Sequence, residues 1–217
     1  EIRPPLNGIL GLSEIALDPR SDDDPKEMLE LINGSAACLL DIVNGILDFS
    51  RIESTGVEVH PRPFYPNTVV GDVLRTLEPK ARVKGLSFSY EQDEGVPPVL
   101  VGDAGIVRQI VFNLVGNSIK FTHSGFVRTS LEFDGMVAGQ AAIRIVVSDS
   151  GIGIAGADMD RIFEAFAQTD SSDTRSYGGT GLGLAITRRL VGALHGDIKV
   201  SSTLGAGSTF AVSLLVD

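Results

Sequence analysis

A mostly apolar repeat along residues 26–53 constrains the fold of this chain more than any other feature. Its members are spaced alternately by four and three positions: Met28, Ile32, Ser35, Leu39, Ile42, Ile46 and Phe49. This seven-residue period is typical of helices that pack along their length. Residues 1–18 carry a second helical pattern, and the turn-like segment 19–25 between the two predicts a helical hairpin.

A hairpin of two such helices buries too little apolar surface to be stable alone. Pairing of residues 1–53 with a second copy, into a four-helix bundle, is the simplest remedy. The alternative is packing of the hairpin against the rest of its own chain.

The rest of the chain mixes helical and strand patterns. Residues 54–66 are rich in Pro, Gly, Ser and Thr and read as a linker with a short strand at 57–59. After it we expect helices at 66–84, 103–122, 157–166 and 181–195, and strands at 86–91, 99–101, 126–133, 142–149, 197–202 and 208–216. Adjacent strands without helical crossovers are antiparallel neighbours. The predicted fold class is therefore α+β: a helical hairpin over 1–54, then an α/β sandwich over 55–217.

Charge and composition narrow the classes of partner. The formal net charge of −10 argues against binding to nucleic acid or to an anionic membrane. Residues 1–54 hold 4 basic and 11 acidic residues against 14 and 17 in the remainder, which also indicates two units. A single cysteine, Cys38, allows no intrachain disulfide. No apolar run reaches the roughly 18 residues that span a bilayer, so we expect no direct membrane contact and a cytoplasmic location. The sequence starts at Glu1 without Met, which suggests a fragment of a longer protein. The absence of a membrane segment then describes only the fragment, and the full-length protein can carry a membrane anchor.

Three polar side chains share one face of the predicted helix 103–122. Asn113, Asn117 and Lys120 lie at steps of four and three, and the same face holds Ile106 and Ile110. Amides that continue a buried apolar stripe need polar partners, because leaving one unpaired costs about 1–3 kcal/mol. Those partners are either nearby backbone groups or a polar ligand.

A carboxylate closes the buried row of the strand 142–149. Asp149 has the same phase as the alternating Ile143, Ile145 and Val147, and Gly151 and Gly153 follow it directly. Such an Asp either caps a helix or accepts a hydrogen bond from an amino group, such as the exocyclic amine of adenine. The glycines would let a flat base lie against backbone.

A glycine-rich stretch from Tyr177 to Leu184 opens the predicted helix 181–195. Its glycines permit positive φ, and free amides at a helix start favour an anion such as phosphate. Residues 168–176 ahead of it are polar, as in a mobile lid. The dinucleotide fingerprint also occurs, at 151–156, but no parallel strand follows within reach. The chain contains no Gly-Lys dipeptide, which excludes a P-loop.

In this order the segments closely resemble the ATP-binding domain of sensor histidine kinases, part of a superfamily with gyrase, Hsp90 and MutL. The boxes of that family are matched by residues 109–122 (N), 149–154 (G1), 163–166 (F), 179–184 (G2) and 205–210 (the last glycine box). Residues 1–9, Glu-Ile-Arg-Pro-Pro-Leu-Asn-Gly-Ile, resemble the segment directly after the phospho-accepting histidine. The hairpin distinguishes a histidine kinase from gyrase-like relatives.

The resemblance implies an ATP-dependent protein-histidine kinase of a two-component system, with ATP and Mg²⁺ as cofactors. The phosphoryl group would pass to a histidine just before Glu1, and then to an Asp of a response-regulator receiver domain. Glu1 would be catalytic, orienting the imidazole and taking its proton. Asn117 would hold Mg²⁺. The nucleotide would contact Asn113, Asn117, Lys120, Asp149, Gly151, Gly153, Tyr177, Gly179, Thr180, Gly181, Leu182, Gly183 and Thr209.

Several positions depart from the family pattern. Pro4 stands where Thr or Asn is usual, which argues against receiver dephosphorylation by that route, and Ile106 and Ser176 replace common basic residues. A non-catalytic nucleotide-binding scaffold is therefore one alternative. A gyrase-like ATPase is the other, although its hydrolysis needs a glutamate on the helix 103–122, which has none.

Overall fold

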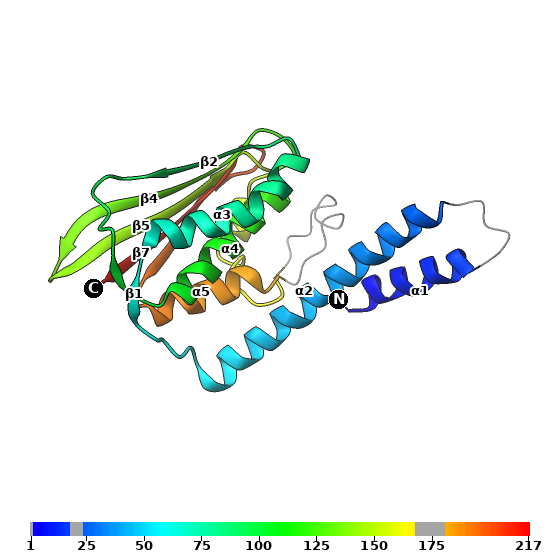
Figure 1. Cartoon of the computed structure of the whole chain (residues 1–217), viewed down its shortest axis with the longest axis horizontal. Coiled ribbons are helices and arrows are strands. Elements are labelled where there is room, and N and C mark those ends of the chain that lie inside the picture. Colours follow the sequence, from blue (N-terminus) through cyan, green and yellow to red (C-terminus); the bar gives the residue numbers. More distant parts are fainter. Residues whose placement is uncertain (1, 18–23, 168–180) are drawn as a thin grey trace.

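The computed structural model describes residues 2–17, 24–167 and 181–217 (Figure 1). The predicted hairpin is present as α1 (Arg3–Leu17) and α2 (Pro25–Thr55). Asp24 caps α2 by accepting a hydrogen bond from the backbone N–H of Lys26, and Pro25 occupies the first turn, where its missing N–H has no cost. Met28 and Ile42 of the seven-residue seam are buried, so the seam faces inward as predicted.

Helix α2 is long and apolar enough to cross a membrane, the one such helix among the residues described. This match in length and composition is weak evidence for a membrane span. The helix packs lengthwise on α1 and carries two apolar stripes, one facing α1 and one exposed. Exposed α2 side chains include Leu29, Leu31, Leu40, Val43 and Leu47.

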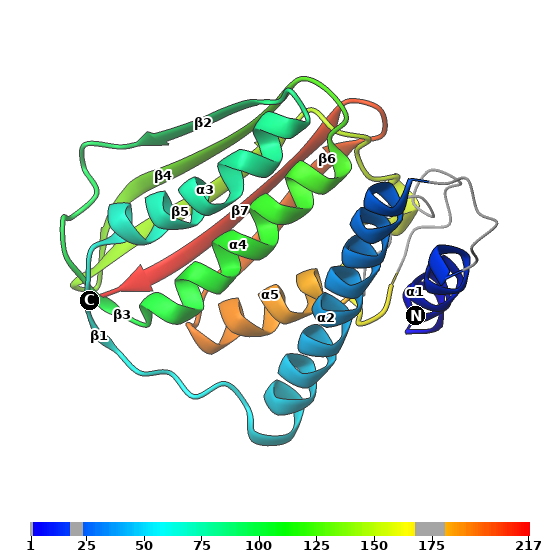
Figure 2. The same ribbon diagram turned by 45° about the vertical axis from the view of Figure 1, so that its right-hand side comes forward.

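The second part of the chain is a five-stranded sheet with three helices on one face (Figure 2). The strand order is β2 (Ser87–Gln92), β4 (Phe126–Val137), β5 (Gln140–Asp149), β7 (Gly207–Val216) and β6 (Asp197–Thr203). The covering helices are α3 (Pro66–Val83), α4 (Ala104–Phe121) and α5 (Gly183–Ala193). This is the predicted α/β sandwich. One pair, β2 with β4, is parallel because α4 lies between these strands in the chain; the other neighbours are antiparallel.

Two local predictions were wrong. No strand forms at 57–59; instead β1 (Arg62–Phe64) pairs with β3 (Leu100–Gly102), a register that buries Phe64. The helix expected at 157–166 is reduced to a 3-10 turn, Gly156–Asp158, followed by irregular turns. None of its apolar side chains is fully buried, and a short helix depends on packing to persist.

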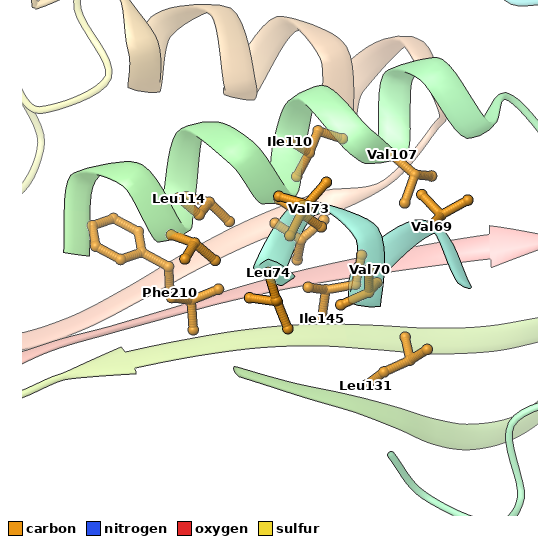
Figure 3. Packing of buried hydrophobic residues seen from close by; sticks show 14 of the residues in the cluster. Val69, Val70, Val73, Leu74, Val107, Ile110, Leu114, Leu131, Ile145 and Phe210 are labelled. Atoms are coloured by element: carbon orange, nitrogen blue, oxygen red, sulfur yellow. The ribbon is translucent and has the colours of Figure 1, made fainter. Parts of the chain in front are cut away.

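The core lies between the helices and the sheet (Figure 3). Valines and leucines of α3 and α4 meet the inward-facing residues of β4, β5 and β7, among them Leu131, Ile145 and Phe210. The opposite face of the sheet carries polar and charged residues, including an ion pair between Arg144 and Glu132. Because one face is buried, the alternation along each strand determines which residues face the helices.

Candidate functional site

Helix α4 carries the amides predicted for the site, and they face the start of α5. The Nδ2 of Asn113 donates to the carbonyl of Gly183 and to the hydroxyl of Thr187, each at 3.3 Å. The Nδ2 of Asn117 lies 3.7 Å from the position that a Cβ on Gly183 would occupy. The ammonium of Lys120 lies 4.7 Å from the ring centroid of Phe121. One face of α4 therefore brings these three polar groups to one side of the domain.

The predicted acid at the end of β5 is buried, with 8% of its surface exposed. Ser118 donates to Oδ2 of Asp149 at 3.0 Å, and the backbone N–H of Gly151 donates to Oδ1 at 2.9 Å. Burial raises the pKa of the Asp149 carboxyl, and hydrogen bonds from Gly151, Ser118 and the backbone of Ser208 oppose that rise. Because Ser118 directly follows Asn117, its hydrogen bond holds Asp149 against the same part of α4 that carries the amides.

Glycines around Asp149 lie where a side chain would collide with backbone. A Cβ on Gly151 would lie 2.5 Å from the carbonyl oxygen of Phe121. Gly153 has φ +67°, and its Cβ would overlap the carbonyl of Thr203. Gly207 has φ +103°, and its Cβ would overlap the carbonyl of Asp149. Three backbone segments thus approach each other at the end of β5 without intervening side chains.

The register of β7 places Thr209 and Ser208 on opposite faces of the sheet. Thr209 pairs with Ser148 across the strands, and their hydroxyls lie 3.0 Å apart on the sheet face away from Asp149. Ser208 pairs with Asp149 and shares its buried face. The sequence held a signal for this: the buried alternation of β7 includes Ser208 and excludes Thr209. Ser208 is therefore the member of the last glycine box that neighbours the acid.

The start of α5 provides backbone groups to the same side. Gly181 has φ +62°, and its carbonyl accepts a hydrogen bond from the N–H of Phe166. Gly183 begins α5 beside Asn117, whereas the side chain of Leu182 is wholly buried in the core. Leu182 can therefore present only its backbone to a ligand. Four predicted residues lie outside the described residues: Glu1, Tyr177, Gly179 and Thr180.

No cluster of three or more His, Cys, Asp or Glu that could hold a metal occurs within residues 2–17, 24–167 and 181–217. The site does offer amide oxygens on α4, which suit a hard cation that binds oxygen and keeps much of its water shell. An ion carried in by a phosphate ligand therefore fits these residues better than an all-protein metal cage.

Family comparison agrees with this geometry across both parts of the chain. Residues 102–217 match the family described as "Histidine kinase-, DNA gyrase B-, and HSP90-like ATPase", and residues 1–55 match the "His Kinase A (phospho-acceptor) domain". The chain belongs to the histidine kinases. The two matches cover the hairpin and most of the α/β domain in the order that the sequence predicted.

Curated histidine kinases align over nearly the whole chain. The Autoinducer 2 sensor kinase/phosphatase LuxQ of Vibrio parahaemolyticus is 38% identical over 100% of the chain, which spans 25% of LuxQ. The Sensor histidine kinase AruS of Pseudomonas aeruginosa is 41% identical over 97% of the chain, which spans 21% of AruS. The chain thus corresponds to about a quarter of the length of these histidine kinases.

Solved histidine kinase structures share the fold. Full-length ShkA in complex with AMPPNP has a TM-score of 0.74 and 31% identity, over 99% of this chain and 44% of ShkA. The histidine kinase ThkA in complex with the response regulator protein TrrA has a TM-score of 0.75 and 24% identity, over 100% of this chain and 59% of the ThkA chain. The second likeness supports the fold alone.

The hairpin of this histidine kinase chain contacts the α/β domain near the site. The ring of Phe49 on α2 meets that of Phe166 edge-on, with centroids 6.1 Å apart. The guanidinium of Arg189 on α5 lies 4.7 Å from the Phe49 ring centroid and pairs with Glu53 at 3.2 Å. Since the N–H of Phe166 donates a hydrogen bond to the carbonyl of Gly181, the contact between Phe49 and Phe166 adjoins the glycine-rich segment.

Proposed function

We propose that the chain is the catalytic core of an ATP-dependent protein histidine kinase in a two-component system. The observation that carries the proposal is the buried Asp149, bonded to Ser118 of α4 and surrounded by glycines. A buried carboxylate beside backbone without side chains suits the edge of a flat base that presents an amino group. Asn117, next to Ser118 on α4, and Asn113, one helical turn before Asn117, suit the phosphate end of the same ligand.

The adenine end of the ligand lies against Asp149 in this proposal. The Asp149 carboxylate accepts from the exocyclic amine of adenine, while Ser118 and the Gly151 N–H keep its two oxygens in place. Gly151 and Gly153 let the loop after β5 lie directly against the backbone of Phe121 and Thr203, which fixes the backbone beside the acid. Ser208, not Thr209, is the hydroxyl residue that stands beside the acid.

The phosphates lie between α4 and the start of α5. Asn117 provides an amide and Lys120 a positive charge on that face, while Asn113, whose Nδ2 donates to Gly183 and Thr187, orients the start of α5 beside them. The first N–H groups of a helix lack partners within the helix, and those of α5 favour an anion here. Mg²⁺, held by Asn117 through its amide oxygen, would neutralise charge on the phosphate oxygens. The protein thus contributes mainly positioning and charge, as phosphoryl transfer requires.

The phosphoryl acceptor is a histidine immediately before Glu1. Its imidazole nitrogen forms a bond to the γ-phosphorus of ATP while the bond to the bridging oxygen breaks, and ADP leaves. The Glu1 carboxylate takes the proton that the imidazole loses. The phosphohistidine then gives its phosphoryl group to an Asp of a receiver domain.

The hairpin forms the dimer in this proposal. Leu40, Val43 and Leu47 follow one residue behind the inward seam and are exposed, which leaves a second apolar stripe on α2. A second hairpin would cover this stripe and complete a four-helix bundle. The receiver domain would dock on the same hairpin, where the phosphohistidine is held, and all these steps would take place in the cytoplasm.

The test is phosphotransfer in a protein that carries a histidine directly before Glu1. Incubation with radiolabelled ATP and Mg²⁺ should give an acid-labile, alkali-stable phosphoprotein. Asn117→Ala should abolish the label while the fold persists by circular dichroism, and Ser130→Ala, on the opposite face of the sheet, should leave labelling intact. Nucleotide binding without label would favour the scaffold alternative, and steady ATP hydrolysis without a phosphoprotein would favour an ATPase.

A further inference from the structure

The turn that ends α3 places one lysine beside another helix. Gly85, with φ +68°, terminates α3 in the left-handed conformation. The N–H of Leu86 bonds the carbonyl of Ala81 at 3.0 Å, and the N–H of Gly85 bonds that of Arg82 at 2.9 Å. These two bonds are the signature of a Schellman cap. Lys84, the last residue before the glycine, is thereby held in a defined direction.

The side chain of Lys84 caps the end of α4. Its ammonium donates to the carbonyls of Ile119 at 2.7 Å, Lys120 at 2.8 Å and Thr122 at 3.3 Å. The last carbonyls of a helix lack partners within the helix and carry partial negative charge. The C-terminal cap of α4 is Thr122, not a glycine, and the chain is already extended at this residue. The ammonium of Lys84, from the end of α3, therefore satisfies the last carbonyls of α4 in place of a glycine cap.

The last turn of α4, which Lys84 caps, contacts both the loop after β5 and the side chain of Asp149. The carbonyl of Phe121 accepts the N–H of Ile152 at 3.2 Å and lies against Gly151. Three residues earlier in the same helix, Ser118 binds Asp149. A shift of this turn would therefore move the loop after β5 and the donor to the acid together.

We propose that Lys84 is a positioning residue for nucleotide binding: its ammonium fixes the last turn of α4, and through Phe121 and Ser118 it fixes the backbone and carboxylate that receive adenine. This inference rests on the proposed function. Lys84 touches neither the base nor the phosphates in this arrangement, so its effect is on binding and not on the chemical step.

The burial of Lys84 supports this role. Partial burial lowers the pKa of the Lys84 amine, so placing a charge there is unfavourable unless carbonyl oxygens compensate for lost water. The nearby Arg82 provides a contrast. Its guanidinium pairs with Glu78 one helical turn back on the exposed surface of α3, at 2.9 Å.

The experiment compares Lys84→Met with Lys84→Arg and Arg82→Met in the histidine-bearing protein. Lys84→Met keeps the length and apolar stem but removes the donors. We expect it to raise the KM for ATP and the Kd of a fluorescent ATP analogue about tenfold, with kcat within about twofold of the parent. Lys84→Arg should recover most of the affinity, and Arg82→Met should leave both constants unchanged.

A second readout does not depend on ATP. Hydrogen exchange of the Ile152 amide should accelerate in Lys84→Met and return toward the parent rate in Lys84→Arg, because the Phe121 carbonyl moves. If Lys84→Met fails to fold, Lys84→Gln, which keeps a neutral donor, takes its place, and we expect an intermediate effect.

Unchanged ATP affinity together with unchanged hydrogen exchange would overturn the role of Lys84. Loss of kcat at constant KM would overturn it as well. Absence of ATP binding by the parent protein would instead overturn the proposed function. The hydrogen exchange of the Ile152 amide would still test whether Lys84 holds the end of α4 in place.

Discussion

Replacing Ser118 by Ala removes one of the hydrogen bonds that hold the buried Asp149. The bond from Ser118 is 3.0 Å long, and the acid is 8% exposed. A hydrogen bond to a charged group contributes about 1.5–3 kcal/mol, and the donors that remain, Gly151 and Ser208, moderate the loss. We expect the free energy of unfolding to fall by about 2 kcal/mol at pH 7. That corresponds to a decrease in Tm of about 4–8 °C for a chain of this length.

The effect should depend on pH in a defined direction. Burial raises the pKa of the Asp149 carboxyl, and the Ser118 bond, which favours the charged form, opposes this rise. Loss of that bond therefore raises the pKa further. The destabilisation should be complete above the raised pKa and diminish as the pH falls through it, because a protonated carboxyl no longer needs the same donors.

Tyrosine fluorescence during urea unfolding can measure this effect in the α/β domain alone. The chain has no tryptophan, and its three tyrosines all lie outside the hairpin. In an Asp149→Asn background, Ser118→Ala should cost about 1 kcal/mol less, since a neutral partner bonds more weakly. Ser130→Ala is the control: it removes a bond to the half-exposed Glu132 and should cost no more than about 1 kcal/mol. Equal costs for Ser118→Ala in both backgrounds would refute the reasoning.

Three further predictions concern the backbone, the hairpin and the acid. Gly153→Ala should lower the free energy of unfolding by about 3 kcal/mol, because a positive φ and steric overlap act together there. Gly205→Ala, at φ +79° but with open space around its Cβ, should lower it by only about 1–2 kcal/mol in the same urea titration. Leu40→Asp should convert the dimer to monomer in light scattering, while Val83→Asp, exposed on α3, should not; a dimeric Leu40→Asp chain would contradict the assigned interface. Asp149→Asn should raise the free energy of unfolding by about 1 kcal/mol at pH 7, and this gain should shrink as the pH falls through the raised pKa of Asp149. The same change should weaken ATP binding in calorimetry. Unaltered ATP affinity would show that Asp149 does not contact adenine.

Periodicity predicted most of the elements because each buries a single face. The four-and-three spacing of α2 and the alternation of β5 identified the residues that face inward, Asp149 among them. Matching the glycine box singled out Thr209, whereas the alternation of buried residues along β7 places Ser208 beside the acid. The short helix at 157–166 failed because its spacing is helical but its burial is incomplete.

Other features depend on contacts between distant segments, which a single sequence does not reveal. The strand at 62–64 forms because β3 is available to pair with it and because Phe64 is buried there. Lys84 lies 35 residues before Ile119, and no local pattern signals that one caps the other. The same is true of the contact between Phe49 and Phe166, whose partners come from the two parts of the chain.

The hydrogen bond between Phe166 and Gly181 joins the segment after β5 to the backbone just before α5. Because the ring of Phe166 also meets that of Phe49 on α2, a change in the tilt of the hairpin would reach the start of α5 through Phe166. Gly183 and Asn117 lie directly beyond this contact, so the orientation of α2 and the position of the α4 amides are mechanically linked.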